Sequence, residues 1–576
     1  MKFQKLVEYF EHLDATTKRL EMFDILSGLF RESPAGEIDR IIYLSQGQLL
    51  PPFRGIEMGM SEKLLIRAIS EATSTPTKTV EETFSRTGDL GAAAEKLITH
   101  RGSNLGVENV YNELMDIAIT SGAGSVEKKI GFLSNLLKGS SSKEAKYIAR
   151  FVLGRLRLGI GDPTVLEALA LAAGDRALRP DLERAYNLCS DLGLVAKTLM
   201  QKGINGVRKF RIHAGYPVRM ALCERLPSPE EIIARLGRTA VEAKYDGFRC
   251  QVHKDGEKIE IFSRNLERTT SMFPDIIKAA RDCITPKKAI FEGEALAFNE
   301  ATGELFPFQI TIQRKRKHGI EESAKEYPLK FFAFELLYMD GIDYTEKPYL
   351  ERREKLESVI KRNNVIEPSE MFITSDPKEI YKYFEAAIER GLEGVVAKRL
   401  DATYAAGARN FNWIKLKRSY RGELADSIDL CIVGYFRGKG SRARLGVGAV
   451  LGTVYEPETD TFRTVSKVGS GFSEKELAEL RDTLDKIRIP HKHPRVESVI
   501  KADVWVEPHY VITVTADEIT RSPSHTAGID SDGIGYALRF PRAVGFLRHD
   551  KKPEDANTVK EVIEMFKQQK NVKVQA

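Results

Sequence analysis

Residues 242–249 read Glu242-Ala243-Lys244-Tyr245-Asp246-Gly247-Phe248-Arg249 and govern how the rest of the chain is interpreted. This short stretch places one lysine among two carboxylates, a flexible glycine and an arginine. At average residue usage, the pattern K-x-D-G alone arises by chance in a chain of this length roughly one time in seven. Requiring the flanking glutamate and arginine lowers that figure to about one in two thousand. The stretch therefore indicates a covalent nucleotide-transfer site with Lys244 as its nucleophile.

A lysine nucleophile must first lose its proton, because only the neutral amine attacks. The ordinary lysine pKa of about 10.4 leaves about one molecule in 2,500 neutral at pH 7. We therefore expect burial or nearby positive charge to lower the pKa of Lys244. Lys415 and Lys417 are the candidate cationic neighbours, since strand alternation would put both on one face. Taken alone, their segment is more typical of a solvated strand edge.

Two further segments, Glu292-Gly293-Glu294 and Glu393-Gly394, place a carboxylate beside a glycine next to an apolar run. Carboxylate oxygens suit magnesium, which a nucleoside triphosphate brings with it. Either glutamate taken singly is more typical of a surface strand end. Phe334 lies in the apolar run 331–337 and would ordinarily be a core residue. Its functional alternative is an aromatic plate for a purine ring.

Composition sets broader limits on the protein. With 576 residues the chain exceeds what one hydrophobic core usually serves, so we expect three domains. The net charge of +6 is only mildly basic, so a nucleic-acid surface would have to come from local clustering. Five cysteines without a C-x-x-C pair argue against a disulfide framework and a cysteine zinc site. With no signal peptide and no membrane-length apolar run, we expect a cytoplasmic, nucleoid-associated protein without a membrane partner.

Hydrophobic periodicity predicts helices over residues 1–212. Leu6, Tyr9, Phe10 and Leu13 recur at three-or-four spacing, which is typical of one face of an amphipathic helix. Helix-start signals appear at Ser61-Glu62 and at Ser141-Ser142-Lys143-Glu144. The pattern predicts an all-α domain.

The predicted secondary structure changes twice further along the chain. Residues 213–417 mix strand-like runs, such as 259–262, with a predicted helix over 350–361, which indicates an α+β domain. Residues 418–576 contain short alternating runs such as 510–514 between glycine-rich turns, which suggests a small β-barrel closed by a helix near 558–570.

The motifs occur in an order that resembles the covalent nucleotidyltransferase superfamily, and specifically the ATP-dependent DNA ligases of the archaeal and eukaryotic replicative type. The resemblance covers nearly the whole chain. It implies an all-α DNA-binding domain, an adenylation domain of the nucleotidyltransferase (ATP-grasp-like) type, and an OB-fold β-barrel domain with a C-terminal helix. The matching segments are Lys244–Gly247 (motif I), Ser263–Asn265 (Ia), Gly293-Glu294 (III), Phe334–Tyr338 (IIIa), Glu393–Lys398 (IV), Trp413–Lys417 (V), and Arg539–Arg542 with Arg548–Lys551 (VI).

The same resemblance assigns roles to individual residues. Lys244 would become adenylylated, and the cofactors would be ATP and Mg²⁺. The remaining assignments are Glu242 and Phe334 for adenine, Arg249 and Glu294 for the ribose side, Arg264, Arg409, Lys415 and Lys417 for the phosphates, Glu294 and Glu393 for the metal, and Arg542 and Lys551 for the leaving pyrophosphate.

A reaction sequence and a substrate follow from the resemblance. Lys244 attacks the α-phosphate of ATP and releases pyrophosphate, AMP then passes to the 5′-phosphate of a nick, and the 3′-hydroxyl displaces AMP. The partner would be nicked double-stranded DNA in replication, repair and recombination, bound by a monomer. No clear sliding-clamp motif is present, so a clamp partner is doubtful.

Two parts of the helical region are candidate DNA-backbone contacts. Gly122, Gly124 and Ser125, followed by Lys128, have the form of a glycine-rich turn into a helix, where free backbone amides attract a phosphate. Arg150, Arg155 and Arg157 make a second basic patch that resembles the family's DNA-binding domain. A tight turn and a solvated helix face are the alternative for both. Backbone contacts of this kind would be independent of DNA sequence.

Three rival interpretations compete with a DNA ligase. An RNA ligase and an mRNA guanylyltransferase share the lysine motif and the two-domain catalytic core, but the long helical region argues against both. A non-catalytic DNA-binding clamp with a dead nucleotide site would require several motifs to persist without chemistry. One departure from the family is Glu335 in motif IIIa, where aspartate is commoner.

Overall fold

The structure is a computed structural model of the chain. It describes residues 1–99, 104–156, 158–298, 305–306, 311, 327–361, 363–390, 392–417, 427–438, 446–516 and 518–574. The chain divides into two compact units, the first made of Met1–Tyr186, Asp191–Phe210 and Ile489–Arg495, and the second of Asn187–Ser190, Arg211–Arg488 and Val496–Ala576. This division does not separate 213–417 from 418–576, so the three predicted domain boundaries stay a prediction.

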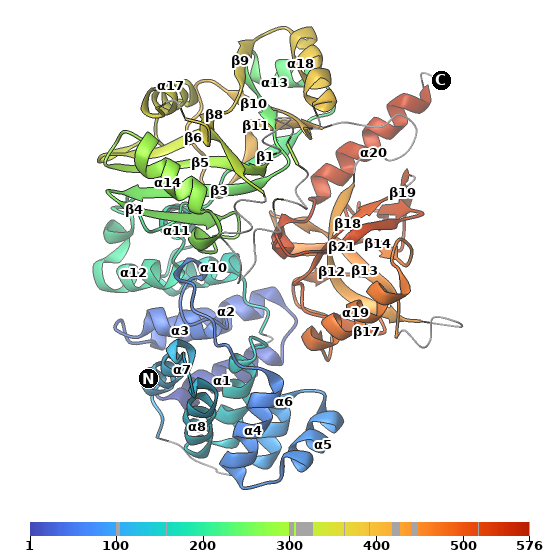
Figure 1. Cartoon of the computed structure of the whole chain (residues 1–576). Helices are drawn as coiled ribbons and strands as arrows, with labels where there is room; N and C mark the ends of the chain where they lie inside the picture. The colour runs from blue at the N-terminus through green and yellow to red at the C-terminus, as the bar shows by residue number, and fades with distance from the viewer. Residues whose placement is uncertain are drawn as a thin grey trace. The chain divides into compact units, whose positions relative to one another are not determined.

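The first unit is helical, as the periodicity predicts (Figure 1). Leu6, Phe10 and Leu13 are buried along one face of α1. Both predicted helix starts are confirmed: the hydroxyl of Ser61 caps α4, and Ser141 forms a capping box with Glu144 at the start of α9. The helices are α1 (Phe3–Asp14), α2 (Arg19–Glu32), α3 (Ile38–Ser45), α4 (Glu62–Thr73), α5 (Thr77–Thr87), α6 (Leu90–Leu97), α7 (Val107–Ile119), α8 (Ser125–Lys138), α9 (Ser142–Val152), α10 (Asp162–Ala172), α11 (Arg179–Cys189) and α12 (Leu192–Val207).

Two sheets in the second unit form the α+β part of the fold. One sheet has the order β1-β11-β10-β2-β9 and is covered by α13 and α18; the other has the order β4-β3-β5-β6-β7, with β8 beside β6, and is covered by α14 and α17 (Figure 1). The strands are β1 (Leu222–Arg225), β2 (Thr239–Lys244), β3 (Phe248–Asp255), β4 (Lys258–Ser263), β5 (Lys288–Ala297), β6 (Leu329–Met339), β7 (Ile342–Asp343), β8 (Ile366–Pro368), β9 (Met371–Thr374), β10 (Gly394–Arg399) and β11 (Arg409–Lys417). The helices are α13 (Pro229–Leu236), α14 (Pro274–Cys283), α17 (Tyr349–Val359) and α18 (Pro377–Glu389).

Two glycines allow the backbone to pass closely at the ends of these strands. A Cβ at Gly247, in the link from β2 to β3, would lie 2.5 Å from the carbonyl oxygen of Ala295. A Cβ at Gly394 would lie 2.1 Å from the carbonyl oxygen of Leu416, and its φ of +144° also disfavours a side chain. Gly247 belongs to motif I and Gly394 to motif IV. The close backbone packing at each glycine therefore fixes the backbone position of the neighbouring motif side chains.

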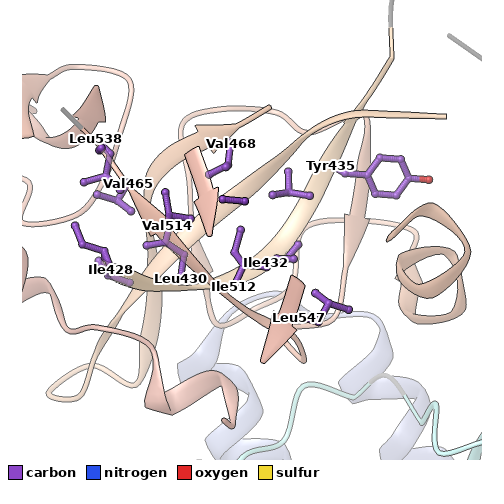
Figure 2. Packing of buried hydrophobic residues seen from close by; sticks show 14 of the residues in the cluster. Ile428, Leu430, Ile432, Tyr435, Val465, Val468, Ile512, Val514, Leu538 and Leu547 are labelled. Carbon is purple, nitrogen blue, oxygen red and sulfur yellow. The ribbon is translucent and has the colours of Figure 1, made fainter. Parts of the chain in front are cut away.

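The C-terminal strands surround a second apolar core. Strand β12 is central, since β13, β17 and β18 all pair with it. Ile428 and Leu430 lie at alternating positions of β12 and are buried in this core with Ile512 and Val514 (Figure 2). Helix α19 (Glu474–Leu484) adds three buried leucines, and α20 (Val559–Val574) closes the chain as predicted. The strands are β12 (Ile428–Arg437), β13 (Val447–Glu456), β14 (Thr461–Val468), β15 (Arg488–Ile489), β16 (Val496–Glu497), β17 (Val504–Val506), β18 (Val511–Thr515), β19 (Glu518–Ser522), β20 (Gly535–Arg539) and β21 (Arg542–Arg548).

The predicted closed barrel is not seen among the described residues. Strands β12 to β18 and β21 form an open, branched sheet in the order β15-β17-β12-β13-β14-β16, while β19 and β20 pair separately. The branch arises because β12 bends at two register shifts and so pairs with different strands along its length. An OB-fold therefore stays a prediction. Within the described parts of the chain, no helix combines the length and apolarity needed to cross a bilayer.

Candidate active site

Lys244 occupies the last position of β2, where the adjoining strand places a carboxylate against it. Gly394 of β10 pairs with Lys244, and the backbone N–H of Glu393 donates to the Lys244 carbonyl at 3.0 Å. The Glu393 Oε2 atom consequently lies 2.5 Å from Lys244 Nζ and 3.3 Å from Lys417 Nζ. Strand β10 pairs with β2 on one side and with β11 on the other, and this pairing brings motifs I, IV and V together.

The charge around Lys244 differs from the expectation. Burial lowers the pKa of Lys244, but the carboxylates of Glu393 and Glu294 outweigh it and raise the pKa above the ordinary lysine value. The expected lowering is therefore wrong for the nucleotide-free protein. The reason is that carboxylates approach the amine more closely than the lysines do: Lys417 contacts Glu393 instead.

A surplus of buried carboxylates surrounds the same amine. Burial raises the pKa of Glu294 to about 7, against the lowering effect of Lys244 and Arg249. Burial, followed by the charge of Glu393, raises the pKa of Asp246 to about 6. These carboxylates are buried close to one another, so their negative charges repel and are poorly hydrated. A bound cation would relieve both costs.

The predicted metal ligands fit magnesium when a nucleotide supplies the other oxygens. Glu294 and Glu393 present hard carboxylate oxygens into one pocket. Among the positions that the structure describes, no group of three or more His, Cys, Asp and Glu side chains is placed to hold a metal alone. Magnesium is usually coordinated by one or two carboxylates together with substrate phosphates, and Glu294 and Glu393 would provide such a pair of carboxylates.

Glu242 and Phe334 also line the pocket, and Lys398 contacts both of them. Glu242 is buried and is held by Tyr349, whose hydroxyl donates to Oε1, and by Ser369, whose hydroxyl donates to Oε2 at 3.0 Å. Phe334 is half-buried, and its ring meets Trp413 edge-on with the centroids 6.1 Å apart. The aromatic ring of Phe334 and the fixed carboxylate of Glu242 line the same pocket, and a purine could stack on the ring and hydrogen-bond to the carboxylate.

Arg249 is fixed by partners that sequence reasoning did not assign. Its guanidinium donates to the carbonyl oxygen of Ala221 at 2.9 Å and to Glu292 Oε2 at 2.8 Å. The guanidinium carbon also lies 5.3 Å from the centre of the Phe334 ring. Glu292 is fully buried and accepts from Tyr404 as well, at 3.0 Å. Glu292 therefore positions Arg249, whereas Glu294, two residues along β5, faces Lys244.

The predicted phosphate-binding cations line the same pocket, and all of them except Lys417, which pairs with Glu393, pair with acidic residues near the C-terminus. Lys415 Nζ lies 2.8 Å from Glu561 Oε1, and Arg409 lies 3.1 Å from the same atom. Arg264 pairs with Asp555 at 2.8 Å. Burial lowers the pKa of Lys415 to about 8, although Glu561 opposes the effect. Carboxylate oxygens thus occupy the positions that these cations would offer to phosphates.

The two motif VI residues have different surroundings. Lys551 lines the pocket and forms an ion pair with Asp429. Arg542 begins β21 with an exposed side chain and does not line the pocket. The predicted contact of Arg542 with pyrophosphate stays a prediction.

The glycine-rich turn in the helical unit has the predicted form. Gly122 and Gly124 have φ values of +86° and +74°, and Gly124 is the residue before α8, which begins at Ser125. Lys128 is exposed one turn into that helix. An added Cβ at either glycine would meet open space, so the turn is accessible. Free amides at such a helix start can bind a phosphate.

The predicted arginine patch is placed differently. Arg150 is buried, with its side chain 8% exposed, and pairs with Asp89 at 2.8 Å and Asp14 at 3.1 Å. These bonds give Arg150 a structural role in joining helices and leave little of it for DNA. Arg155 pairs with Glu62 at 2.7 Å. Arg157 lies outside the described residues.

Several residues of the pocket received no role from sequence reasoning. Lys398 and Trp413 belong to the matched motifs IV and V but received no role, and both line the pocket beside Glu242. The signal was available: β10 alternates so that Val396 and Lys398 share a face, and Val396 pairs directly with Glu242. A lysine within a mostly apolar, buried strand needs a buried partner, and Glu242 is that partner.

Comparison with known proteins agrees with this site. Three family models match the chain: the DNA ligase N terminus over residues 2–170, the ATP dependent DNA ligase domain over 220–417, and the ATP dependent DNA ligase C terminal region over 443–551. A protein of Dictyoglomus turgidum named "Probable DNA ligase" is 51% identical, covering 100% of this chain and 99% of that protein. "DNA ligase 2" of Thermofilum pendens is 45% identical and "DNA ligase" of Sulfolobus acidocaldarius 43% identical, each with the same coverage.

The site and fold define a covalent nucleotidyltransferase. Full-length similarity at this level shows that the chain belongs to the ATP-dependent DNA ligase family. It is accordingly an enzyme that uses ATP to seal nicks in DNA, and Mg²⁺ is the standard metal of that family.

Proposed function

We propose that Lys244 is the residue that carries AMP between ATP and DNA. The observation that carries this proposal is the convergence of Lys244, Glu294, Phe334 and Lys415 on one pocket. In the first step the Lys244 amine forms a bond to the α-phosphorus of ATP as the bond to pyrophosphate breaks. In the second, an oxygen of the nick's 5′-phosphate takes AMP and the Lys244 amine leaves. In the third, the 3′-hydroxyl attacks that 5′-phosphate, loses its proton, and AMP departs.

The surrounding side chains have distinct tasks in these steps. Phe334 stacks on the adenine ring and Glu242 accepts from its edge. Arg249, fixed by Glu292, holds the ribose side. Lys415 and Lys417 neutralise phosphate oxygens, which lowers the energy of charge that builds up at phosphorus. Magnesium bound by Glu294 and Glu393 would supply further positive charge at the phosphates.

Proton removal from Lys244 is the step that the pocket has to arrange. In the nucleotide-free protein Glu393 holds the amine as an ammonium. Burial raises the pKa of Glu393, but the charges of Lys244 and Lys417 outweigh it and hold that pKa well below its ordinary value, so Glu393 pairs with the ammonium and is a poor acceptor for its proton. Lys417 lies 3.3 Å from the same oxygen, and its positive charge weakens the attraction between Glu393 and the Lys244 ammonium.

We further propose how the chain is organised around DNA. Residues 1–212 form the DNA-binding domain, 213–417 the adenylation domain and 418–576 an OB-fold domain. The turn at Gly122 and Gly124 with Lys128 contacts the backbone of nicked duplex DNA, supported by the exposure of both glycines and of the lysine. The protein acts as a monomer, and its sequence carries no clear sliding-clamp motif. Five free cysteines support a reducing, cytoplasmic setting.

Labelling with ATP tests the nucleophile. The protein mixed with Mg²⁺ and α-phosphate-labelled ATP should retain label in an acid-labile, base-resistant bond, and added nicked duplex should then remove it. Lys244→Ala should lose labelling and sealing while keeping DNA affinity. Lys128→Ala is the matched control, which should label normally but bind DNA more weakly. Label on the Lys244→Ala protein at the wild-type level would refute the assignment.

A further inference from the structure

Arg249 lines the pocket, but the two groups that anchor it lie behind the pocket wall. Its guanidinium donates to the carbonyl oxygen of Ala221 at 2.9 Å and to Glu292 Oε2 at 2.8 Å. Glu294 is the residue directly opposite Arg249 on β5, yet the guanidinium reaches diagonally to Glu292. The Arg249 Nε–H is buried without a hydrogen-bond partner among the described residues, so it is a donor that remains for a ligand. The position of this donor depends on the two anchors.

The hydroxyl of Tyr404 contacts both anchors at once. The backbone N–H of Ala221 donates to Tyr404 Oη at 2.8 Å, and the hydroxyl donates to Glu292 Oε2 at 3.0 Å. That carboxylate oxygen is the same one that accepts from Arg249. Burial, followed by the charge of Glu292, raises the pKa of Tyr404 well above its ordinary value, so the hydroxyl keeps its proton and stays a donor. One hydroxyl thus joins the two groups that hold Arg249.

Gln251 fixes the other oxygen of Glu292. Its Nε2 donates to Glu292 Oε1 at 2.9 Å and to the carbonyl oxygen of Val218 at 2.9 Å. Its Oε1 accepts from the Val218 N–H at 2.8 Å and lies 2.8 Å from His253 Nε2. The four hydrogen-bonding positions of this fully buried amide are therefore all used, and it cannot turn away. With Oε1 fixed in this way, the position of Oε2 is set by the groups that donate to it, Arg249 and Tyr404.

We propose that Tyr404 is a positioning residue of this enzyme, whose hydroxyl fixes the Arg249 guanidinium by holding Glu292 and Ala221 together. The inference rests on the proposed function, in which Arg249 holds the ribose side of ATP. Tyr404 does not line the pocket, so its hydroxyl can affect the nucleotide only through a residue that does. Arg249 is that residue, because it shares both partners of the hydroxyl. Tyr404→Phe removes the hydroxyl alone and keeps the contact of the ring with Trp413.

The test measures binding of α,β-methylene-ATP, in which a CH₂ group replaces the bridging oxygen so that AMP cannot pass to Lys244. Calorimetric titration with Mg²⁺ gives the Kd for the wild type, Tyr404→Phe, Arg249→Met and the double variant. Tyr404→Phe should raise the Kd roughly three- to thirtyfold, the usual range of coupling within one hydrogen-bond network. In the double variant the Kd should equal that of Arg249→Met, because the hydroxyl acts through Arg249. An equal rise in both backgrounds would overturn the inference, since a merely structural hydroxyl gives that result.

Tyr435→Phe is the matched control. Tyr435 is another buried tyrosine of the second unit, and its hydroxyl donates to Asp485 outside the pocket, so this variant should bind the analogue as the wild type does. Glu292→Gln keeps the shape of one anchor without its charge and should also weaken binding. Wild-type affinity in Tyr404→Phe or in Glu292→Gln would overturn the inference even if Arg249→Met does not fold. Absence of any lysyl adduct from ATP in the wild-type protein would instead refute the proposed function.

Discussion

The ammonium of Lys244 lies 2.5 Å from Oε2 of Glu393, and that single contact sets the protonation of the nucleophile before ATP arrives. Glu393 belongs to motif IV, far along the chain from motif I, and reaches Lys244 only because β10 pairs with β2. Burial alone would favour a neutral amine, but Glu393 and then Glu294 reverse the effect. Glu393 and Glu294 therefore favour the charged form of Lys244, and the positive charge of a bound nucleotide's metal would have to oppose them.

Glu393→Gln should lower the pKa of Lys244, because it removes the strongest influence that raises it and leaves the lowering effect of burial. The amine should then react with an acylating reagent at lower pH than in the wild type, without ATP or metal present. Quantitative mass spectrometry of the peptide that contains Lys244 measures the modified fraction at each pH. The exposed Lys128 is an internal reference whose profile should not move. An unshifted Lys244 profile would contradict this account of its charge.

Phe334→Ala should weaken ATP binding. Base stacking on an aromatic ring contributes about 1–3 kcal/mol, which corresponds to a roughly five- to hundredfold rise in the KM for ATP during adduct formation. The half-buried ring faces the edge of Trp413, so Phe334→Tyr should keep the stack and most of the affinity. Initial rates of label transfer at several ATP concentrations separate the two variants. A normal KM for Phe334→Ala would exclude stacking on this ring.

The family resemblance was sufficient to predict which side chains share one site. Lys244, Glu294, Phe334 and Lys415 converge on one pocket, as that resemblance implies. The charge of Lys244 was not predictable from the same residues, since it depends on a 2.5 Å distance that only strand pairing creates. The barrel was over-predicted for a related reason: alternation identifies a strand such as β12 but not how many neighbours pair with it.

The arginine patch shows the same limit. Arg150 lies in the last turn of α9, where it pairs with two acidic side chains from other parts of the helical unit and is buried. Sequence spacing does not reveal partners 61 and 136 positions away. Lys128, by contrast, follows a local turn, and local signals placed it correctly on the surface.

Arg150→Met should destabilise the helical unit without changing how DNA affinity depends on salt. Removing one partner of a buried ion pair typically costs about 3–5 kcal/mol, and here both Asp14 and Asp89 would lose a cationic partner. Lys128→Ala should do the opposite: its stability should stay normal, and the slope of log affinity against log salt should fall by about one. Thermal unfolding and DNA titrations at several salt concentrations measure both effects. A reduced salt slope in a folded Arg150→Met protein would restore Arg150 as a DNA contact.

Glu11 should make the packing of α1 against α9 sensitive to acid. Burial raises the pKa of Glu11, but hydrogen bonds from Lys146 and Tyr147 outweigh it and lower the pKa to about 2, from an ordinary value of 4.5. Because the folded pKa is the lower one, the stabilisation is fully present above about pH 4.5 and is lost as pH falls toward 2. Hydrogen exchange of the α9 amides should therefore show more protection in the wild type than in Glu11→Gln at pH 6. That difference should shrink steadily below pH 4.5, whereas a constant difference down to pH 2.5 would show that the Glu11 carboxylate does not stabilise this contact through its charge.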